Sequence, residues 1–82
     1  MSTARTKDER YMICAYEEAS KKGDFSTILN RYEIGNLIGI HPRGVDTICA
    51  LLIQANFIKK SGQTDIYLTK NGEDLVLRLL SE

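Results

Sequence analysis

The first part of the chain carries one apolar stripe at helical spacing, made of Met12, Ala15, Tyr16 and Ala19. That spacing is typical of an amphipathic helix. Thr6 and Glu9 form a T-x-x-E capping box ahead of the stripe, and Gly23 supplies a stop behind it. The pattern predicts a helix over residues 7–22. Residues 1–6 are small, polar and unpatterned, so we expect a flexible tail there.

Two further helices, separated by a tight turn, are predicted in the middle of the chain. A short β-compatible stretch at residues 26–29 comes before them. Asn30 is a suitable cap for the first of these helices, and Gly39 ends it. Pro42 suits the first position of the second helix because that position needs no amide donor. This helix is predicted over residues 42–55.

The remaining segment predicts a hairpin followed by a final helix. Asn56 tolerates the left-handed conformation that ends a helix. The hairpin is expected over residues 57–69, with strands at residues 57–60 and 66–69. Thr69 is a plausible cap for the final helix, whose apolar contacts would be Leu75, Val76, Leu79 and Leu80.

Glycine and apolar spacing in the middle of the chain suggests how the two central helices meet. Gly35 lies four residues before Gly39, and Ile40 follows directly. A small residue at Gly35 lets the helices approach closely, and Gly39 permits a positive φ at the turn. Ile40 would fill the space between the helices. The apolar stripe that faces the core from the second of them is Val45, Ile48, Cys49 and Leu52.

This spacing resembles the helix-turn-helix motif, with Gly35 where many members carry Ala. The stretch 52–58 resembles the end of a recognition helix that runs into the first wing strand. The stretch 66–72 is similar to the return strand and helix start of small winged-helix regulators. The resemblance covers nearly all of residues 8–80, and it points to the fold but to no family within it.

The resemblance implies an α+β winged helix-turn-helix domain over residues 7–82. It would have a three-helix core, a β-hairpin wing and a C-terminal helix. It also implies the usual activity of such domains, which is duplex DNA binding in transcription regulation. The recognition helix over residues 42–55 would enter the major groove, and the hairpin would lie against the DNA backbone.

The length and the charge of the chain narrow the range of functions that it can have. The 82 residues make room for one small domain. Eleven basic and eleven acidic side chains cancel, which excludes a strongly basic binder and leaves any DNA contact to local charge. The longest apolar run, residues 48–53, is far too short to span a bilayer, and the start of the chain does not resemble a signal peptide. We therefore expect a cytoplasmic protein that does not interact with membranes.

Few residues here have the chemistry of a catalytic or metal site. The chain has one His and two Cys, without metal-ligand spacing. It has no nucleophile motif and no phosphate-cradling glycine loop. We expect neither an enzyme nor a cofactor. Cys49 lies on the predicted core stripe, whereas Cys14 faces away from the main stripe of its helix.

The predicted reading face lies opposite the core stripe of the helix over residues 42–55. It consists of Arg43, Thr47, Ala50 and Gln54. Arg43 suits guanine, Thr47 or Ala50 a thymine methyl, and Gln54 adenine. Gly44 would let the backbone approach closely, or is simply a glycine tolerated in the first turn.

Phosphate contacts are expected around this face. The predicted wing contacts are Lys59, Lys60, Gln63 and Thr64. Arg31 and Tyr32, at the start of the preceding helix, would assist them, and His41 is expected in a turn or phosphate-contacting role. Asp46 lies beside the reading face and would repel phosphate. Alternatively, the two lysines lie on an edge strand, where their charge prevents aggregation with other chains.

Some apolar residues lie off the predicted stripes, and two interpretations of these residues remain open. Tyr11, Ile13 and Leu77 would be scattered surface residues or part of a homodimer interface built from the first and last helices. Leu51 and Ile53 lie on the shoulders of the proposed recognition helix. With zero net charge, they support an alternative function, a protein-interaction module that reuses the winged-helix fold.

Overall fold

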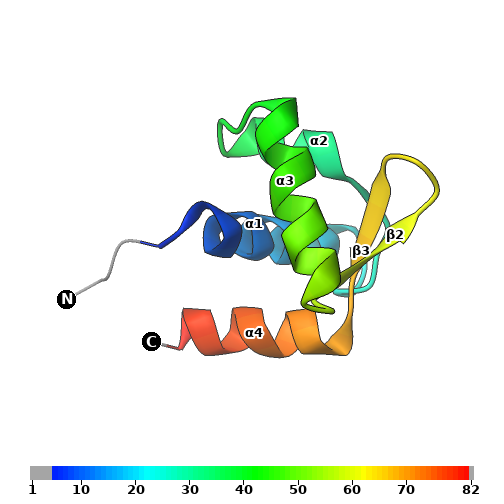
Figure 1. Ribbon diagram of the computed structural model, residues 1–82. Helices are drawn as coiled ribbons and strands as arrows, with labels where there is room; N and C mark the ends of the chain where they lie inside the picture. The colour runs from blue at the N-terminus through cyan, green and yellow to red at the C-terminus, as the bar shows by residue number, and fades with distance from the viewer. Residues whose placement is uncertain (1–4, 82) are drawn as a thin grey trace.

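The computed structural model describes residues 5–81. Over this range the chain forms four helices and a three-stranded sheet (Figure 1). In chain order the elements are α1 (Lys7–Lys22), β1 (Leu29–Asn30), α2 (Arg31–Leu37), α3 (Pro42–Gln54), β2 (Ile58–Ser61), β3 (Asp65–Leu68) and α4 (Lys70–Leu80). The predicted α+β winged helix-turn-helix architecture is confirmed.

The start of α1 shows both hydrogen bonds of a capping box. The Thr6 side chain accepts from the Glu9 amide at 3.2 Å, and a Glu9 carboxylate oxygen accepts from the Thr6 amide at 2.9 Å. Arg5 Nη2 donates to the Leu79 carbonyl of α4 at 2.8 Å. The last two residues of the predicted tail 1–6 thus make hydrogen bonds to α4 and α1, the cap at Thr6 is present as predicted, and residues 1–4 lie outside the described part.

The sheet is antiparallel with strand order β1-β3-β2. The hairpin pairs Ile58 with Leu68 and Lys60 with Ile66, while the two-residue β1 adds Leu29 on the other side of Ile66. Both hairpin strands differ from the prediction by one residue at their ends. Thr69 does not belong to β3, because its side chain accepts from the Gly72 amide and caps α4.

Close packing between α2 and α3 depends on Gly35. A Cβ at this position would overlap the Val45 Cγ2 methyl group. Gly39 has a φ of 71° at the turn between the helices, and Asn56 has a φ of 66° where α3 gives way to β2. The sequence predicted a small residue at the first site and left-handed backbone at the other two. All three predictions are confirmed.

The core lies where α1, α3 and α4 meet the inner face of the sheet. Its largest fully buried side chains are Tyr11, Met12, Leu29, Ile34, Ile58, Ile66 and Leu68. The predicted core stripe of α3 is buried as expected. In α1 the buried face is rotated relative to the prediction, because Tyr11 is fully buried while Tyr16 is only half-buried.

Candidate nucleic-acid interface

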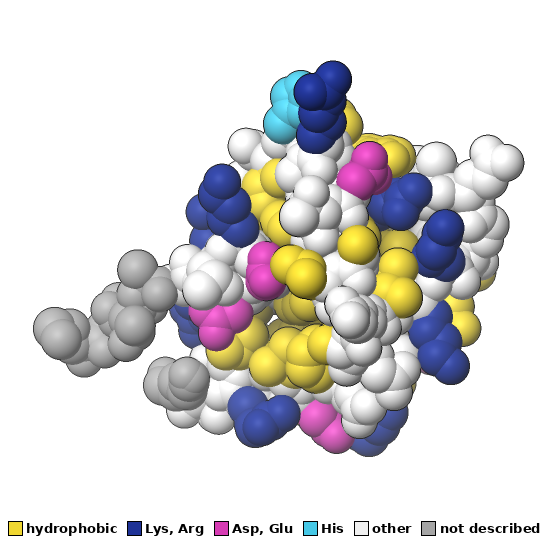
Figure 2. Space-filling view, in the orientation of Figure 1, with side chains coloured by type: hydrophobic (Ala, Val, Ile, Leu, Met, Phe, Trp, Pro, Cys, Tyr) yellow, Lys and Arg dark blue, Asp and Glu magenta, His cyan; other side chains and the backbone are white. Residues whose placement is uncertain are grey.

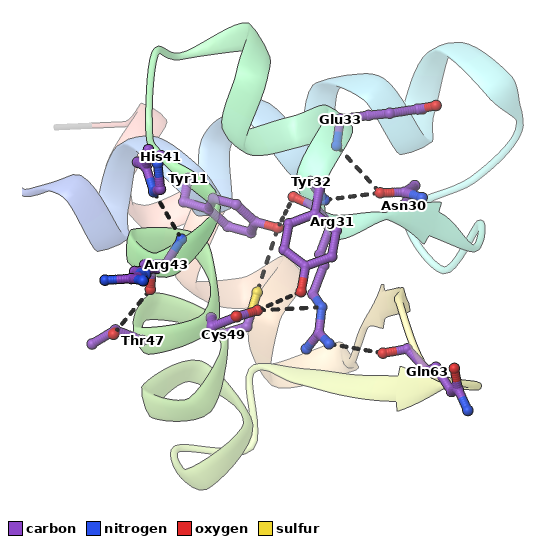
Figure 3. Close-up of polar contacts among 11 residues, drawn as sticks. Tyr11, Asn30, Arg31, Tyr32, Glu33, His41, Arg43, Thr47, Cys49 and Gln63 are labelled. Carbon is purple, nitrogen blue, oxygen red and sulfur yellow. Dashed lines mark hydrogen bonds and ion pairs between the residues drawn. The ribbon is translucent and has the colours of Figure 1, made fainter.

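The N-terminus of α3 is shaped by His41. Its imidazole Nδ1 accepts from the Arg43 amide at 3.2 Å, so it caps the helix, and Pro42 occupies the first turn (Figure 3). His41 is thus a helix cap in the turn, one of its two expected roles, and its side chain remains exposed. The capped end projects from the body of the molecule (Figure 1).

The outer face of α3 carries the four predicted reading residues, and all four are exposed. Thr47 Oγ1 donates to the Arg43 carbonyl at 3.2 Å, which leaves its methyl group and the acceptor lone pairs of its oxygen free to contact a base (Figure 3). Gly44 is half-buried, and a Cβ there would approach Ile40 Cγ2 to 3.0 Å. Its small size therefore serves packing against the turn, a role that differs from both predicted ones, and close approach of its backbone to DNA stays a prediction.

The wing carries two exposed cations on consecutive residues of β2, so their side chains point to opposite faces of the strand. Lys59 and Lys60 of β2 are exposed, as are Gln63 and Thr64 in the turn, where Gly62 has a φ of 77°. The backbone carbonyls of Gln63 and Thr64 are both used internally, because Arg31 donates to each of them. Figure 2 shows basic side chains along the edges of this face and apolar ones toward its centre.

Arg31 and Tyr32 occupy a different place from the one expected of simple phosphate contacts. The Arg31 side chain is only 15% exposed, and its Nη2 donates to the Gln63 carbonyl at 2.7 Å. The Tyr32 hydroxyl donates to Asp46 Oδ1 at 2.7 Å, and this hydrogen bond raises the pKa of the phenol. Arg31 Nε lies 3.9 Å from the same carboxylate oxygen, and its guanidinium lies 5.2 Å from the Tyr32 ring centroid.

This cluster of Arg31, Tyr32, Asp46 and Gln63 joins α2, α3 and the wing (Figure 3). Sequence reasoning treated its members separately. It assigned Asp46 only a repulsive effect on phosphate, although the carboxylate has two partners within the protein. The sequence contains only part of the information needed to predict this cluster. Arg31 directly follows the cap Asn30, so its side chain starts near the sheet, but nothing marks Asp46 as its partner.

A second polar chain lies behind the interface, inside the core. The Cys49 thiol donates to the Tyr11 hydroxyl at 3.4 Å, and that hydroxyl donates to the Arg31 carbonyl at 2.8 Å (Figure 3). Burial raises the pKa of both the Tyr11 phenol and the Cys49 thiol. Both groups thus stay neutral at physiological pH and act as hydrogen-bond donors.

Two hollows border α3 on the side away from the wing. The larger, of about 590 Å³, lies between the start of α1 and the turn before α3, and its lining includes Lys7, Arg10 and Thr47. The smaller, of about 380 Å³, lies between the end of α3 and α4 and is mainly apolar, with Leu52, Phe57 and Leu75 in its lining. Leu51 is 51% exposed and lines both.

The residues expected at a homodimer interface have three different environments. Tyr11 is fully buried and hydrogen-bonded, so its assignment to a dimer surface is wrong. The physical reason is that α1 is covered on more than one side, by α2 and α3 as well as α4. Ile13 is half-buried against the core, and Leu77 is 45% exposed on α4.

Within residues 5–81, no helix has the length and apolar character needed to cross a membrane. The same part of the chain contains no group of three or more His, Cys, Asp or Glu residues arranged to hold a metal ion.

The hairpin beside a helix-turn-helix places the chain in the winged-helix class of folds. Among solved structures, it is similar to the crystal structure of SSV1 F-93, with a TM-score of 0.61 and 19% sequence identity over 95% of this chain and 83% of that one. At this identity the likeness establishes the fold alone. No family model and no curated protein matches the sequence.

Proposed function

We propose that this protein binds duplex DNA as a non-enzymatic transcription regulator, with α3 in the major groove and the β2–β3 wing against the backbone. One observation carries the proposal. The fold presents Arg43, Thr47, Ala50 and Gln54 together on the exposed face of α3, and strand β2, which contacts α3, carries the exposed Lys59 and Lys60. This is the combination of base-reading and phosphate-contacting groups that winged helices use.

Electrostatics supports a modest affinity per chain. Lys59 and Lys60 are the two exposed cations that the proposal places against phosphates, while Arg43 faces base edges. Two neutralised phosphates correspond to a slope of about −2 in a plot of log K against log salt. Asp46 opposes binding less than its position suggests, because Arg31 and Tyr32 already face its carboxylate.

Fluorescence anisotropy on a mixed-sequence duplex across a salt series tests the proposal. Binding should weaken with salt, and Lys59→Ala/Lys60→Ala should make the slope shallower by about 2. Lys70→Ala/Arg78→Ala is the matched control, because it removes the same charge from α4, which the proposal leaves off the DNA. Absence of binding by the unmodified protein at low salt would overturn the proposal.

A homodimer would double these contacts and read two half-sites. We propose α4 as the main contributor to its interface, because Leu77 and Leu80 are both about half exposed there, at 45% and 48%. Tyr11 has no part in it.

A protein-interaction module is the second candidate function. The observation that favours it is Leu51, which is half exposed on α3 and borders two hollows. Ile53 contributes less than expected, since it packs partly against the core. In this case the unmodified protein would show little salt-dependent DNA binding, and Leu51→Glu would abolish partner binding.

A further inference from the structure

We infer that Arg31 is a positioning residue that holds the wing at a set place relative to α3, with Asp46 orienting its guanidinium. The inference rests on the proposed function for its consequence in DNA binding. Its structural part, the order of the wing, can be measured without DNA.

Two hydrogen bonds join Arg31 to the wing turn. Its amide donates to the Thr64 carbonyl at 3.1 Å, and its Nη2 donates to the Gln63 carbonyl at 2.7 Å. The two acceptors are consecutive residues that lead directly into β3. β1 already pairs with β3 up to Asn30 and Asp65, so the amide bond continues that ladder by one residue and the side-chain bond extends the support into the turn.

The same side chain forms an ion pair with Asp46 of α3. Asp46 Oδ1 lies 3.9 Å from Arg31 Nε, which is too long for a hydrogen bond, so the buried Nε has no hydrogen-bond partner among the described residues, and the Tyr32 hydroxyl donates to that oxygen at 2.7 Å. The Tyr32 ring lies beside the guanidinium, 5.2 Å from its centroid, a distance at which a cation and an aromatic ring attract each other. Asp46 is one residue from Thr47 of the reading face, so the support connects the wing to the helix proposed to read bases.

The backbone of Arg31 is in turn anchored to the core. Its carbonyl accepts from the fully buried Tyr11 hydroxyl at 2.8 Å. Arg31 also begins α2 directly after Asn30, whose side chain accepts from the Tyr32 and Glu33 amides. Arg31 is therefore held by α1 and α2 while it reaches Asp46 and the wing. A guanidinium suits this task because its several fixed donors can serve two directions at once.

The arrangement changes the role of Asp46. On sequence grounds its charge opposes DNA binding, since it lies beside the reading face. In the structure its carboxylate orients Arg31 and Tyr32, so that removing it relieves a repulsion but also loosens the support of the wing. A lysine in place of Arg31 would keep the positive charge, but it would lose the planar guanidinium that faces both the Gln63 carbonyl and Asp46.

Hydrogen exchange and ¹⁵N relaxation measure the support directly. Arg31→Gln should speed exchange of the amide at position 31 about tenfold or more, after correction for intrinsic rates, and increase fast motion at Gly62 to Thr64. Asp46→Asn should also speed this amide exchange and increase this fast motion, but by a smaller amount than Arg31→Gln does. Arg78→Gln, which removes the same charge from exposed α4, is the control and should change neither. Far-ultraviolet circular dichroism confirms that each variant is folded.

A double-mutant cycle on duplex DNA separates positioning from direct phosphate contact. If Arg31 acts through the wing, Arg31→Gln weakens binding in the unmodified protein but has little further effect when Lys59→Ala/Lys60→Ala has already removed the wing contacts. If Arg31 itself contacts phosphate, its effect is the same in both backgrounds and the slope against log salt falls by about 1. The second result would overturn the positioning role.

The two proposals can fail separately. Unchanged exchange and relaxation in both Arg31→Gln and Asp46→Asn would overturn the inference even if the protein binds DNA. Conversely, a protein that binds no DNA, but whose wing loosens in these variants, would refute the proposed function and still establish Arg31 as the residue that holds the wing.

Discussion

The hydroxyl of Tyr11 and the backbone carbonyl of Arg31 are joined by a 2.8 Å hydrogen bond between α1 and the first residue of α2. Because Tyr11 is fully buried, this bond forms where water cannot replace it. The Cys49 thiol of α3 donates to the same hydroxyl at 3.4 Å. One phenol therefore connects the three helices on which the recognition surface is built.

Tyr11→Phe keeps the ring in the core and removes only this hydroxyl. We expect the free energy of unfolding to fall by about 1–2 kcal/mol, because a buried carbonyl and a buried thiol lose their partner. Urea denaturation measures the change. Tyr16→Phe, on the same helix but half-buried, is the matched control. Equal stability of the Tyr11→Phe and unmodified proteins would show that the buried bond contributes nothing.

Gly35→Ala tests the close approach of α2 and α3. The new methyl group would overlap Val45 Cγ2, so we expect a net loss of about 1–3 kcal/mol despite the better helix propensity of alanine. Val45→Ala removes the overlapping methyl group. The double variant should therefore lose less stability than the sum of the two single variants, as measured by thermal unfolding. Simple additivity would contradict the packing argument.

Arg43→Ala tests base reading by α3. In a selection among random duplexes, we expect this variant to lose preference at one base pair, worth about 1–3 kcal/mol, with guanine the base most affected. Lys59→Ala should instead weaken binding to all sequences alike, because phosphate contacts carry no sequence information. An unaltered site preference in Arg43→Ala would mean that another residue reads the DNA.

The two thiols should react at different rates with a disulfide reagent. Only the thiolate attacks, and burial raises the pKa of both cysteines, with Glu18 and Glu17 adding to the shift at Cys14. At pH 8 both should therefore react more slowly than a free cysteine, with rates that rise with pH. Cys14 is half-buried and should be labelled first, whereas Cys49 should wait for unfolding. Cys14→Ser identifies the two phases in a stopped-flow trace.

Leu77→Glu tests the proposed dimer interface. If α4 forms the interface, sedimentation velocity should show a dimer for the unmodified protein and a monomer for this variant, because a buried carboxylate without a partner is costly. Leu37→Glu is the matched control, since Leu37 is 60% exposed on α2. A dimer that survives Leu77→Glu would place the interface elsewhere.

Local signals account for most of the fold that could be predicted. The capping box at Thr6, the glycine at the α2–α3 turn and Asn56 after α3 each act within a few residues of the chain, so their effect is visible in sequence. The rotation of α1 has a sequence signal that the prediction did not use. Tyr11 lies four residues before Ala15 and eight before Ala19, so it belongs to the same stripe at helical spacing, and Tyr16 lies at the edge of that stripe.

The candidate site also has one part that could be predicted from the sequence and one part that could not. Exposure of Arg43 and Gln54 follows from the helical period of α3 once its buried face is known. The cluster around Arg31 does not follow, because Asp46 and Gln63 are 15 and 32 positions further along the chain and share no periodic pattern with it. Only the arrangement of α2, α3 and the wing brings them together. Binding of DNA by these residues remains a prediction.

The bond from Arg5 to the Leu79 carbonyl ties the start of α1 to the end of α4, at the end of the molecule that lies opposite the wing in Figure 1. A fluorophore or an immobilisation tag attached at Arg5 or at the end of α4 would therefore emerge on the same side. The protein can be tethered to a sensor surface through either of these positions with the wing facing solution, which suits measurements of duplex capture under flow.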